Sequence, residues 1–191
     1  MPSYLRPTEL DDALKALAVG GHTIVAGGTD FYPARVGRNI DEDVLDVTAI
    51  DGLRAIEART DPTNGDHFYI GAGATWTDLI RADLPDWFRA MKQAAREVGG
   101  VQIQNAGTIV GNVCNASPAA DGMPGLVALD ASVVLASVSG EREVPISEFV
   151  QGNRKTARKP DEMVLGLRIP DCGTAATSAF LKLGARKYLV I

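Results

Sequence analysis

The stretch TIVAGGTDFYP, residues 23–33, joins a short run suited to a buried strand directly to two adjacent glycines. Gly27 and Gly28 leave the backbone bare, and Thr29 adds a hydroxyl group. Consecutive small residues let several backbone N–H groups converge on one anion without interference from Cβ atoms. The stretch matches neither G-x-G-x-x-G nor G-x-x-x-x-G-K-[ST], the two common nucleotide-binding patterns. It therefore indicates either an anion-binding turn or a turn whose glycines only permit positive φ.

A second stretch rich in small and polar residues, NAGTIVGNVCNASPAADGMP, spans residues 105–124. Its apolar members, among them Ile109, Val110 and Val113, predict that it is partly buried. Buried polar groups need hydrogen-bond partners. The stretch is thus either an irregular loop with Asx and Ser turns, or one that satisfies its polar groups on a bound cofactor. Its small or hydrogen-bonding residues are Gly107, Thr108, Gly111, Asn112, Asn115, Ser117 and Asp121.

The composition is that of a soluble globular protein without a nucleic-acid footprint. The 191 residues are 46% hydrophobic and 23% charged, with a formal net charge of −5. No apolar run approaches the roughly 20 residues that span a bilayer, and the N-terminus lacks an apolar signal core. The locally basic run RKTARK, residues 154–159, is expected to be a solvated loop.

Cysteine and histidine are scarce. Cys114 and Cys172 lie far apart, which predicts no disulfide and a cytoplasmic location. Two cysteines are too few to ligate an iron–sulfur cluster from this chain alone. With His22 and His67 as the only histidines, a His-based metal site is not expected, and no metal ligand is assigned.

Periodicity and turn signals predict a mixed α+β chain. Helices are expected after an N-cap at Thr8, after an N-cap at Thr75, and over 85–100 and 121–131, with a helical turn within 31–39. Strands are expected over 22–28, 43–50, 161–170 and 177–191. Two hairpins are expected, one around Asn64-Gly65 and one around Ser139-Gly140. The apolar end of the chain favours a fragment of something longer.

These motifs resemble a known family. VAGGTDF, followed about 80 residues later by GTIVGNVCNASPAADGMPGLVALDA, is similar to the FAD-binding (medium) subunit of molybdenum hydroxylases. That family includes subunits of carbon monoxide dehydrogenase, xanthine dehydrogenase and 4-hydroxybenzoyl-CoA reductase. The resemblance also covers GAGATWTDL and AFLKLGAR, so it extends over nearly the whole chain.

The resemblance implies an α+β, two-lobed FAD-binding fold of the vanillyl-alcohol oxidase and molybdopterin dehydrogenase type. It implies a small α/β lobe over 1–52, a larger α+β lobe over 53–177, and the start of a C-terminal domain over 178–191 that is otherwise missing.

By resemblance, residues 25–31 would wrap the FAD pyrophosphate and the nearby sugar through backbone N–H groups, and the second stretch would contribute the second wall. Val98 and Val164 fall where family members pack apolar side chains near the cofactor, and Lys182 would be a polar contact to the flavin. The implied cofactor residues are Val25, Ala26, Gly27, Gly28, Thr29, Asp30, Phe31, Val98, Gly107, Thr108, Gly111, Asn112, Asn115, Ser117, Asp121, Val164 and Lys182.

The resemblance also implies an oxidoreductase subunit that transfers electrons. Its partners would be a large molybdenum-cofactor subunit and a small [2Fe-2S] subunit in a hetero-oligomer. FAD would take electrons from the iron–sulfur clusters and pass them to an external acceptor. No catalytic residue is expected on this chain, because the isoalloxazine carries the redox chemistry.

Two departures from the family pattern keep alternatives open. Val110 stands where the family has the first glycine of TIGGN, and the chain stops before the C-terminal domain of its relatives. A valine would resist a backbone position that needs positive φ. One alternative is therefore a truncated paralogue without FAD that acts as a structural subunit. The other is a different flavin oxidoreductase with the same fold.

Overall fold

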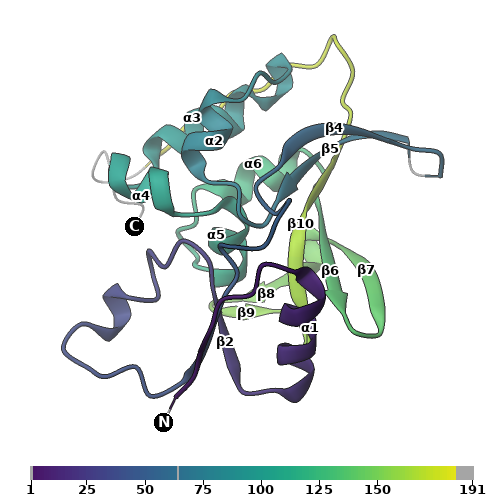
Figure 1. Cartoon of the computed structure of the whole chain (residues 1–191). Coiled ribbons are helices and arrows are strands. Elements are labelled where there is room, and N and C mark those ends of the chain that lie inside the picture. Colours follow the sequence, from purple (N-terminus) through teal and green to yellow (C-terminus); the bar gives the residue numbers. More distant parts are fainter. Residues whose placement is uncertain (1, 64, 184–191) are drawn as a thin grey trace.

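The computed structural model describes residues 2–63 and 65–183 and contains two separate sheets flanked by helices (Figure 1). A small three-stranded sheet is built from the first part of the chain, and a five-stranded sheet from the remainder. A two-stranded ribbon is added beside them. The mixed α+β class predicted from the sequence is confirmed.

The small sheet is entirely parallel. It consists of β1 (Tyr4–Leu5), β3 (Asp43–Asp46) and β2 (His22–Val25) in that spatial order. The crossover between β1 and β2 is α1 (Leu10–Val19), which buries Leu14 and Leu17. The predicted N-cap at Thr8 is wrong: Glu9 occupies the cap position and makes no side-chain capping bond. Between β2 and β3 a long loop carries the short helix η1 (Pro33–Arg35), as predicted.

The large sheet is entirely antiparallel, with the spatial order β4-β5-β10-β6-β7. The predicted hairpin around Ser139-Gly140 is confirmed. The strands expected on either side of Asn64-Gly65 also pair antiparallel, up to Asp61 and Gly65, and Asn64 itself lies outside the described residues. β10 is central and buried along most of its length, so it reads as a continuous apolar run. The strands are β4 (Ile56–Asp61), β5 (Gly65–Gly71), β6 (Ser132–Ser137), β7 (Gly140–Pro145) and β10 (Met163–Pro170).

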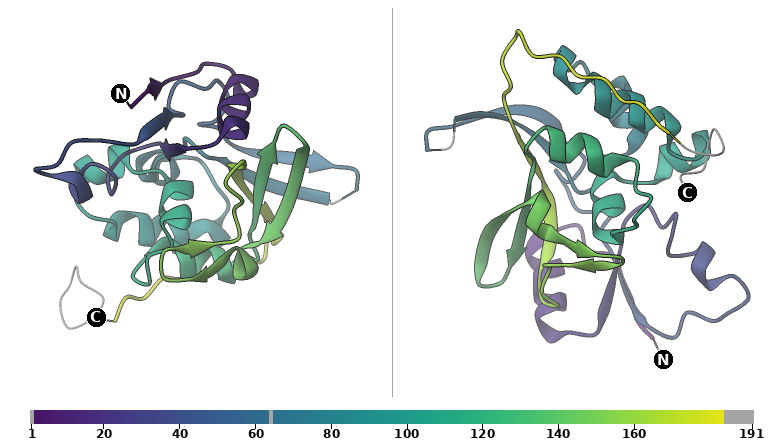
Figure 2. Two further views of the ribbon diagram at one scale, coloured as in Figure 1. Left: turned by 90° about the horizontal axis from the view of Figure 1, so that it is seen from below. Right: turned by 180° about the vertical axis from the view of Figure 1, so that it is seen from behind.

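The helices labelled α2 to α6 in Figure 1 gather on one side of the large sheet, and α1 lies apart from them (Figures 1 and 2). Thr75 caps α2 in a full capping box with Asp78, as predicted. The helices are α2 (Trp76–Arg81), η2 (Asp86–Phe88), α3 (Arg89–Glu97), α4 (Val101–Ala106), α5 (Ile109–Asn115), α6 (Gly122–Ala128) and α7 (Ile146–Phe149). The ribbon is formed by β8 (Val150–Gly152) and β9 (Lys155–Thr156).

One apolar core joins the helices to both sheets. Its largest members include Trp76, Trp87 and Phe88, each at most 2% exposed. Trp87 and Phe88 stack with ring centroids 4.2 Å apart, and Phe68 meets Trp87 edge-on at 5.3 Å. These side chains hold η2 and α3 against β5, so the helical layer is fixed relative to the large sheet.

The segment after β10 returns across α3, which Figure 2 shows in its right-hand view. Ser178 Oγ donates to Trp87 O at 2.6 Å and accepts from Ala90 N at 2.9 Å, and Phe180 N donates to Gln93 Oε1 at 2.9 Å. The predicted strand over 177–191 is wrong for residues 177–183, which form no strand. These residues satisfy their polar groups on a helix instead of on a neighbouring strand. The rest of that predicted strand lies outside the described residues.

The predicted boundary between residues 52 and 53 falls between the two sheets, and it remains a prediction together with the division at 177/178. Within the described ranges 2–63 and 65–183, no helix combines the length and apolar character needed to cross a membrane.

Candidate functional site

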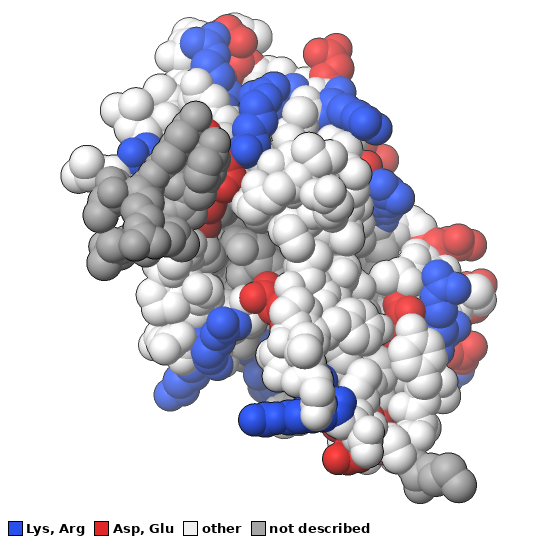
Figure 3. Space-filling view, turned by 90° about the vertical axis from the view of Figure 1, so that its left-hand side faces the viewer, with Lys and Arg blue, Asp and Glu red and all other residues white. Residues whose placement is uncertain are grey.

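A cavity of about 770 Å³ lies where the small sheet meets the helical layer. Its walls come from β2 and the loop after it, from α4 and α5, and from the start of β10. This volume is in the range of roughly 300–1,000 Å³ that is typical of small-molecule and cofactor sites. Figure 3 views the molecule from the side on which α4 and the η1 loop lie in Figure 1, and shows basic and acidic side chains interspersed there.

The first glycine stretch forms one wall of the cavity. The amide N–H groups from Gly27 to Phe31 donate no hydrogen bond to any other group in the described part of the chain. Gly28 has φ +66, and a Cβ there would lie 2.5 Å from the Tyr32 ring, so both conformation and space demand glycine. A row of free amides on a cavity wall is an anion-binding arrangement.

The second stretch lies directly against the first. A Cβ on Gly27 would lie 1.9 Å from Ala106 O, and one on Gly107 would lie 3.3 Å from Thr29 Oγ1. The second stretch is in turn tied to the large sheet, because Ile109 N donates to Ala74 O at 3.0 Å. The two glycine-rich stretches, about 80 residues apart in the sequence, are thus adjoining walls of one cavity.

The alternative of an irregular loop over 105–124 is wrong for residues 109–115, which form α5, whereas α6 lies within the helix predicted over 121–131. Thr108 Oγ1 accepts from Gly111 N at 3.0 Å and caps α5. Val110 lies inside α5 with a helical backbone and is not among the positive-φ residues. The backbone conflict considered for this valine does not arise, and its side chain lines the cavity while 3% exposed.

An ion pair stabilises the loop after β2. Arg35 pairs with Glu42 at 2.5 Å, donates to Phe31 O at 2.8 Å, and lies 3.7 Å above the Phe31 ring. The hydroxyl of Thr23 and then the guanidinium of Arg35 lower the pKa of Glu42, so its carboxylate is charged at neutral pH. These contacts fix the loop that carries the free amides.

Most of the predicted cofactor residues line this cavity. Asp121 and Lys182 form an ion pair with Nζ and Oδ1 2.9 Å apart, and neither they nor Ser117 are part of the lining. The predicted residues that do line it are Val25, Ala26, Gly27, Gly28, Thr29, Asp30, Phe31, Val98, Gly107, Thr108, Gly111, Asn112, Asn115 and Val164.

Three basic residues that line the cavity lie outside the two glycine-rich stretches and were not predicted as cofactor residues. Arg154 and Arg158 come from the basic run that was expected to be a solvated loop, and Arg35 comes from the loop after β2. The lining holds these three arginines and one acidic residue, Asp30. Within the described lining, basic side chains thus outnumber acidic ones, and Arg35 is in addition paired with Glu42.

Two buried polar atoms on the cavity lining lack a partner among the described residues: Asn112 Oδ1 and His22 Nδ1. Buried polar groups are normally hydrogen-bonded, so each is a place where a ligand can bond. Cys114 also lines the cavity, and burial raises the pKa of its thiol to about 11. The thiol is therefore neutral at pH 7 and behaves as a small apolar group.

Comparison with known proteins gives a consistent result. Residues 1–172 match the model of the FAD binding domain in molybdopterin dehydrogenase. The chain is 36% identical over 177 residues to the nicotinate dehydrogenase FAD-subunit of Eubacterium barkeri, covering 88% of this chain and 57% of that protein. It is 32% identical to the glyceraldehyde dehydrogenase medium chain of Sulfolobus acidocaldarius, covering 88% and 59%.

A solved structure of carbon monoxide dehydrogenase from Hydrogenophaga pseudoflava matches with a TM-score of 0.83 and 26% identity, over 97% of this chain and 64% of that one. The chain thus spans less than two thirds of the length of these relatives. The family match covers most of the chain, and the cavity and glycine walls lie within it. The chain belongs to the family of FAD-binding domains of molybdopterin dehydrogenases.

Proposed function

We propose that the chain binds FAD in the cavity between its two glycine-rich walls and serves as the FAD-binding part of an oxidoreductase subunit. The observation that carries the proposal is the run of free amide N–H groups from Gly27 to Phe31 on the cavity wall. These donors suit a pyrophosphate, because amide groups hold phosphate oxygens without a full charge of their own.

The residues present fit the rest of the dinucleotide as well. The lining as a whole carries more basic than acidic side chains, Arg35, Arg154 and Arg158 against Asp30, which favours a ligand with a net negative charge such as a dinucleotide. The unpartnered Asn112 Oδ1 and His22 Nδ1 offer polar contacts for hydroxyl groups or ring nitrogens. Apolar side chains for the faces of planar rings are available at Val98, Ile103, Val110, Met163 and Val164.

The role of this chain is binding and orientation. When bound, the isoalloxazine ring of FAD supplies the redox chemistry. The amides of the first stretch hold the phosphates, and the Arg35–Glu42 pair keeps that loop in place. The close approach of Gly27 to Ala106 O fixes the separation of the two walls. No catalytic acid, base or nucleophile is assigned to this chain.

The proposal extends to the assembly. The relatives are named as FAD-subunits or medium chains of dehydrogenases, which supports a hetero-oligomer. We infer that the partners are a molybdenum-cofactor subunit and a [2Fe-2S] subunit, which supply electrons to the flavin for an external acceptor. A cytoplasmic location is part of the same proposal and is based on the low cysteine content.

The alternative of a paralogue that has lost FAD is less favoured. One of its grounds was a backbone conflict at Val110, and the helical conformation there removes it. A different flavin oxidoreductase with this fold is disfavoured by the family match over residues 1–172.

Titration of the purified chain with FAD tests the proposal. We expect saturable one-to-one binding, with quenching of flavin fluorescence and a visible spectrum distinct from that of free FAD. FMN, which lacks the adenylate half, is expected to bind more weakly. If the folded chain shows no saturable FAD binding by calorimetry, the proposal is refuted.

A further inference from the structure

Arg158 is held rigidly at the cavity wall by main-chain carbonyls. Its Nη1 donates to Glu162 O at 2.7 Å and to Lys159 O at 3.0 Å. Within the described ranges, its Nε and Nη2 donate to no protein acceptor and no carboxylate pairs with it. The side chain is half-buried and lines the cavity. It is thus a fixed planar cation with donors left over for a ligand.

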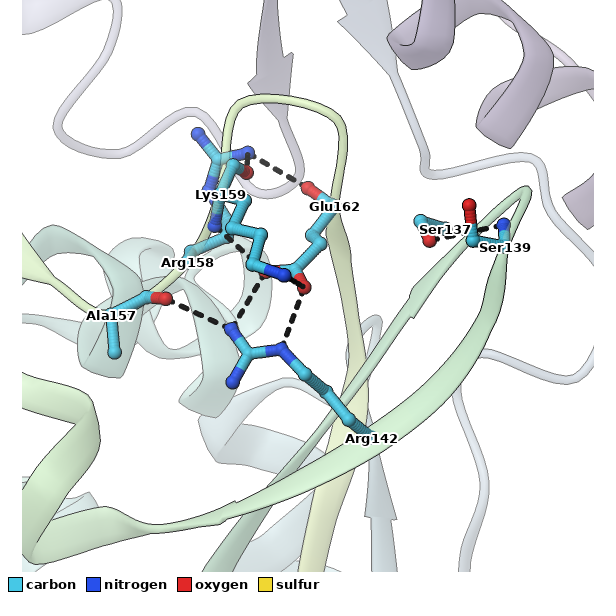
Figure 4. A network of polar contacts seen from close by, with 7 residues as sticks. All are labelled: Ser137, Ser139, Arg142, Ala157, Arg158, Lys159 and Glu162. Atoms are coloured by element: carbon cyan, nitrogen blue, oxygen red, sulfur yellow. Dashed lines mark hydrogen bonds and ion pairs between the residues drawn. The ribbon is translucent and has the colours of Figure 1, made fainter.

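An ion-pair network around the buried carboxylate of Glu162 keeps this arrangement in place (Figure 4). Glu162, whose side chain is 5% exposed, accepts from Arg142 Nε at 2.6 Å and Nη2 at 2.8 Å, and from Lys159 N at 2.7 Å. Arg142 Nη2 also donates to Ala157 O at 2.9 Å. The network therefore holds the chain on both sides of Arg158, so little conformational entropy is lost when its guanidinium binds a ligand.

The surroundings of Arg158 favour a planar ring over a phosphate. Its charge acts on Cys114, and Met163 and Val164 follow directly after Glu162, so the nearby lining is apolar. Cys114 lies near the end of α5, six residues after its N-cap Thr108, so the two residues are separated by about 9 Å along the helix axis. The free amides of the first stretch lie against the Thr108 end of α5, so phosphates held there are remote from Arg158.

The two ends of the cavity differ. At the α4 end the lining includes Ile103, which is 37% exposed, and Val101 beside it is 65% exposed, so this end merges with an apolar surface. At the other end the lining includes Met163 and Val164 of β10, which are only 1% and 4% exposed, so the cavity is more enclosed there. A ring that must exchange electrons with a partner belongs at the open end, and the redox-inactive ring belongs at the enclosed end.

We propose that Arg158 is a cofactor-binding residue that contacts the adenosine end of FAD, with its guanidinium against the adenine ring and its free N–H groups available to ring nitrogens. This inference rests on the proposed function, because it takes the bound ligand to be FAD. Glu162 and Arg142 are positioning residues for this contact. A guanidinium over a desolvated aromatic ring is worth enough for about a tenfold change in affinity.

The test compares Arg158→Met with Arg81→Met, a matched loss of one positive charge at the exposed end of α2, away from the cavity. FAD affinity is measured by calorimetry, and the visible spectrum and reduction potential of the bound flavin are recorded for each protein. We expect Arg158→Met to weaken FAD binding about tenfold without changing the spectrum or the potential. Arg81→Met is expected to match the unmodified chain in all three. Circular dichroism confirms folding, and Arg158→Lys is the substitute if the methionine variant does not fold.

Two results overturn the inference while leaving the proposed function standing. Unchanged FAD affinity in Arg158→Met shows that the residue makes no contact. A shifted spectrum or potential places it against the isoalloxazine instead. Failure of the unmodified chain to bind FAD refutes the proposed function, and the inference with it.

Discussion

Substituting Gly27 by alanine tests whether the close approach of the two walls creates the cofactor site. A Cβ at this position would lie 1.9 Å from Ala106 O, 2.6 Å from Ala106 C and 2.9 Å from Gly107 Cα. All three atoms are backbone, so no flexible side chain can move aside. Gly27 is not among the positive-φ glycines, which leaves the steric clash as the main effect of the substitution.

The walls must separate by more than about 1 Å to bring that contact to a tolerated distance, and overpacking of this kind costs about 3 kcal/mol. For a chain of this length that corresponds to a fall in Tm of about 6–12 °C. A separated pair of walls also loses phosphate contacts. Loss of two charge-assisted hydrogen bonds at about 1.5 kcal/mol each weakens FAD binding about 100-fold.

The assay is calorimetric titration with FAD at a temperature where each variant is folded, together with thermal unfolding followed by circular dichroism. Gly100→Ala is the matched control, because its backbone is also not in the positive-φ region and its Cβ would meet only the flexible Gln102 Oε1, at 3.3 Å. We expect the control to bind FAD like the unmodified chain. If Gly27→Ala binds FAD with unchanged affinity, the walls do not need this separation and the reasoning about the site is wrong.

Three further predictions concern the supports of the site. Glu162→Gln should lower the free energy of unfolding by about 2 kcal/mol at pH 7, a value reduced from that of a fully buried pair because the Arg142 side chain is 35% exposed. Its bond to Arg142 lowers the pKa of Glu162, so this stabilisation is present above the unfolded-state pKa of about 4.3 and is lost as pH falls through the lower folded-state pKa. Urea denaturation should therefore show a smaller difference in the free energy of unfolding between the unmodified chain and Glu162→Gln at pH 3 than at pH 7. An equal difference at both pH values would contradict this explanation. Thr108→Ala removes the cap of α5 and should cost about 1 kcal/mol, with Thr108→Ser close to the unmodified chain; equal Tm values for the alanine and serine variants would count against the cap. Burial raises the pKa of Cys114 to about 11, so iodoacetamide at pH 8 should label exposed Cys172 well before Cys114, as measured by peptide mass spectrometry; equal rates would show that Cys114 is accessible.

Local signals in the sequence were enough for much of the fold. The cap at Thr75, the hairpin around Ser139-Gly140 and the apolar run of β10 were predicted because each depends on neighbours within a few residues. The same is true of the first glycine stretch, where Gly28 needs its positive φ. Thr8 failed as an N-cap because Thr and Glu compete for adjacent positions, and packing of α1 against the sheet sets the starting residue.

Other features depended on contacts between distant residues. The segment at 177–183 has a strand-like sequence, yet its polar groups bond to α3, as at Ser178. Lys182 and Asp121, both predicted to contact the cofactor, form an ion pair with each other instead of lining the cavity. Neither the missing strand nor the Lys182–Asp121 ion pair can be predicted from neighbouring residues in the sequence, because each depends on the surface that the chain meets after β10.

The sequence by itself showed two glycine-rich stretches whose bare backbone and small polar side chains suit a phosphate-bearing cofactor, and it left open that their glycines only permit turns. Only the tertiary structure decided that Gly27 abuts Ala106 and so makes the two stretches into adjoining walls of one cavity. It also placed Arg158 of the basic run on the cavity lining, since the buried carboxylate of Glu162 folds that run inward. A charged residue in a polar run is solvated by default, and here the pairing of buried Glu162 with Arg142, which is distant in the sequence, holds the run at the cavity instead.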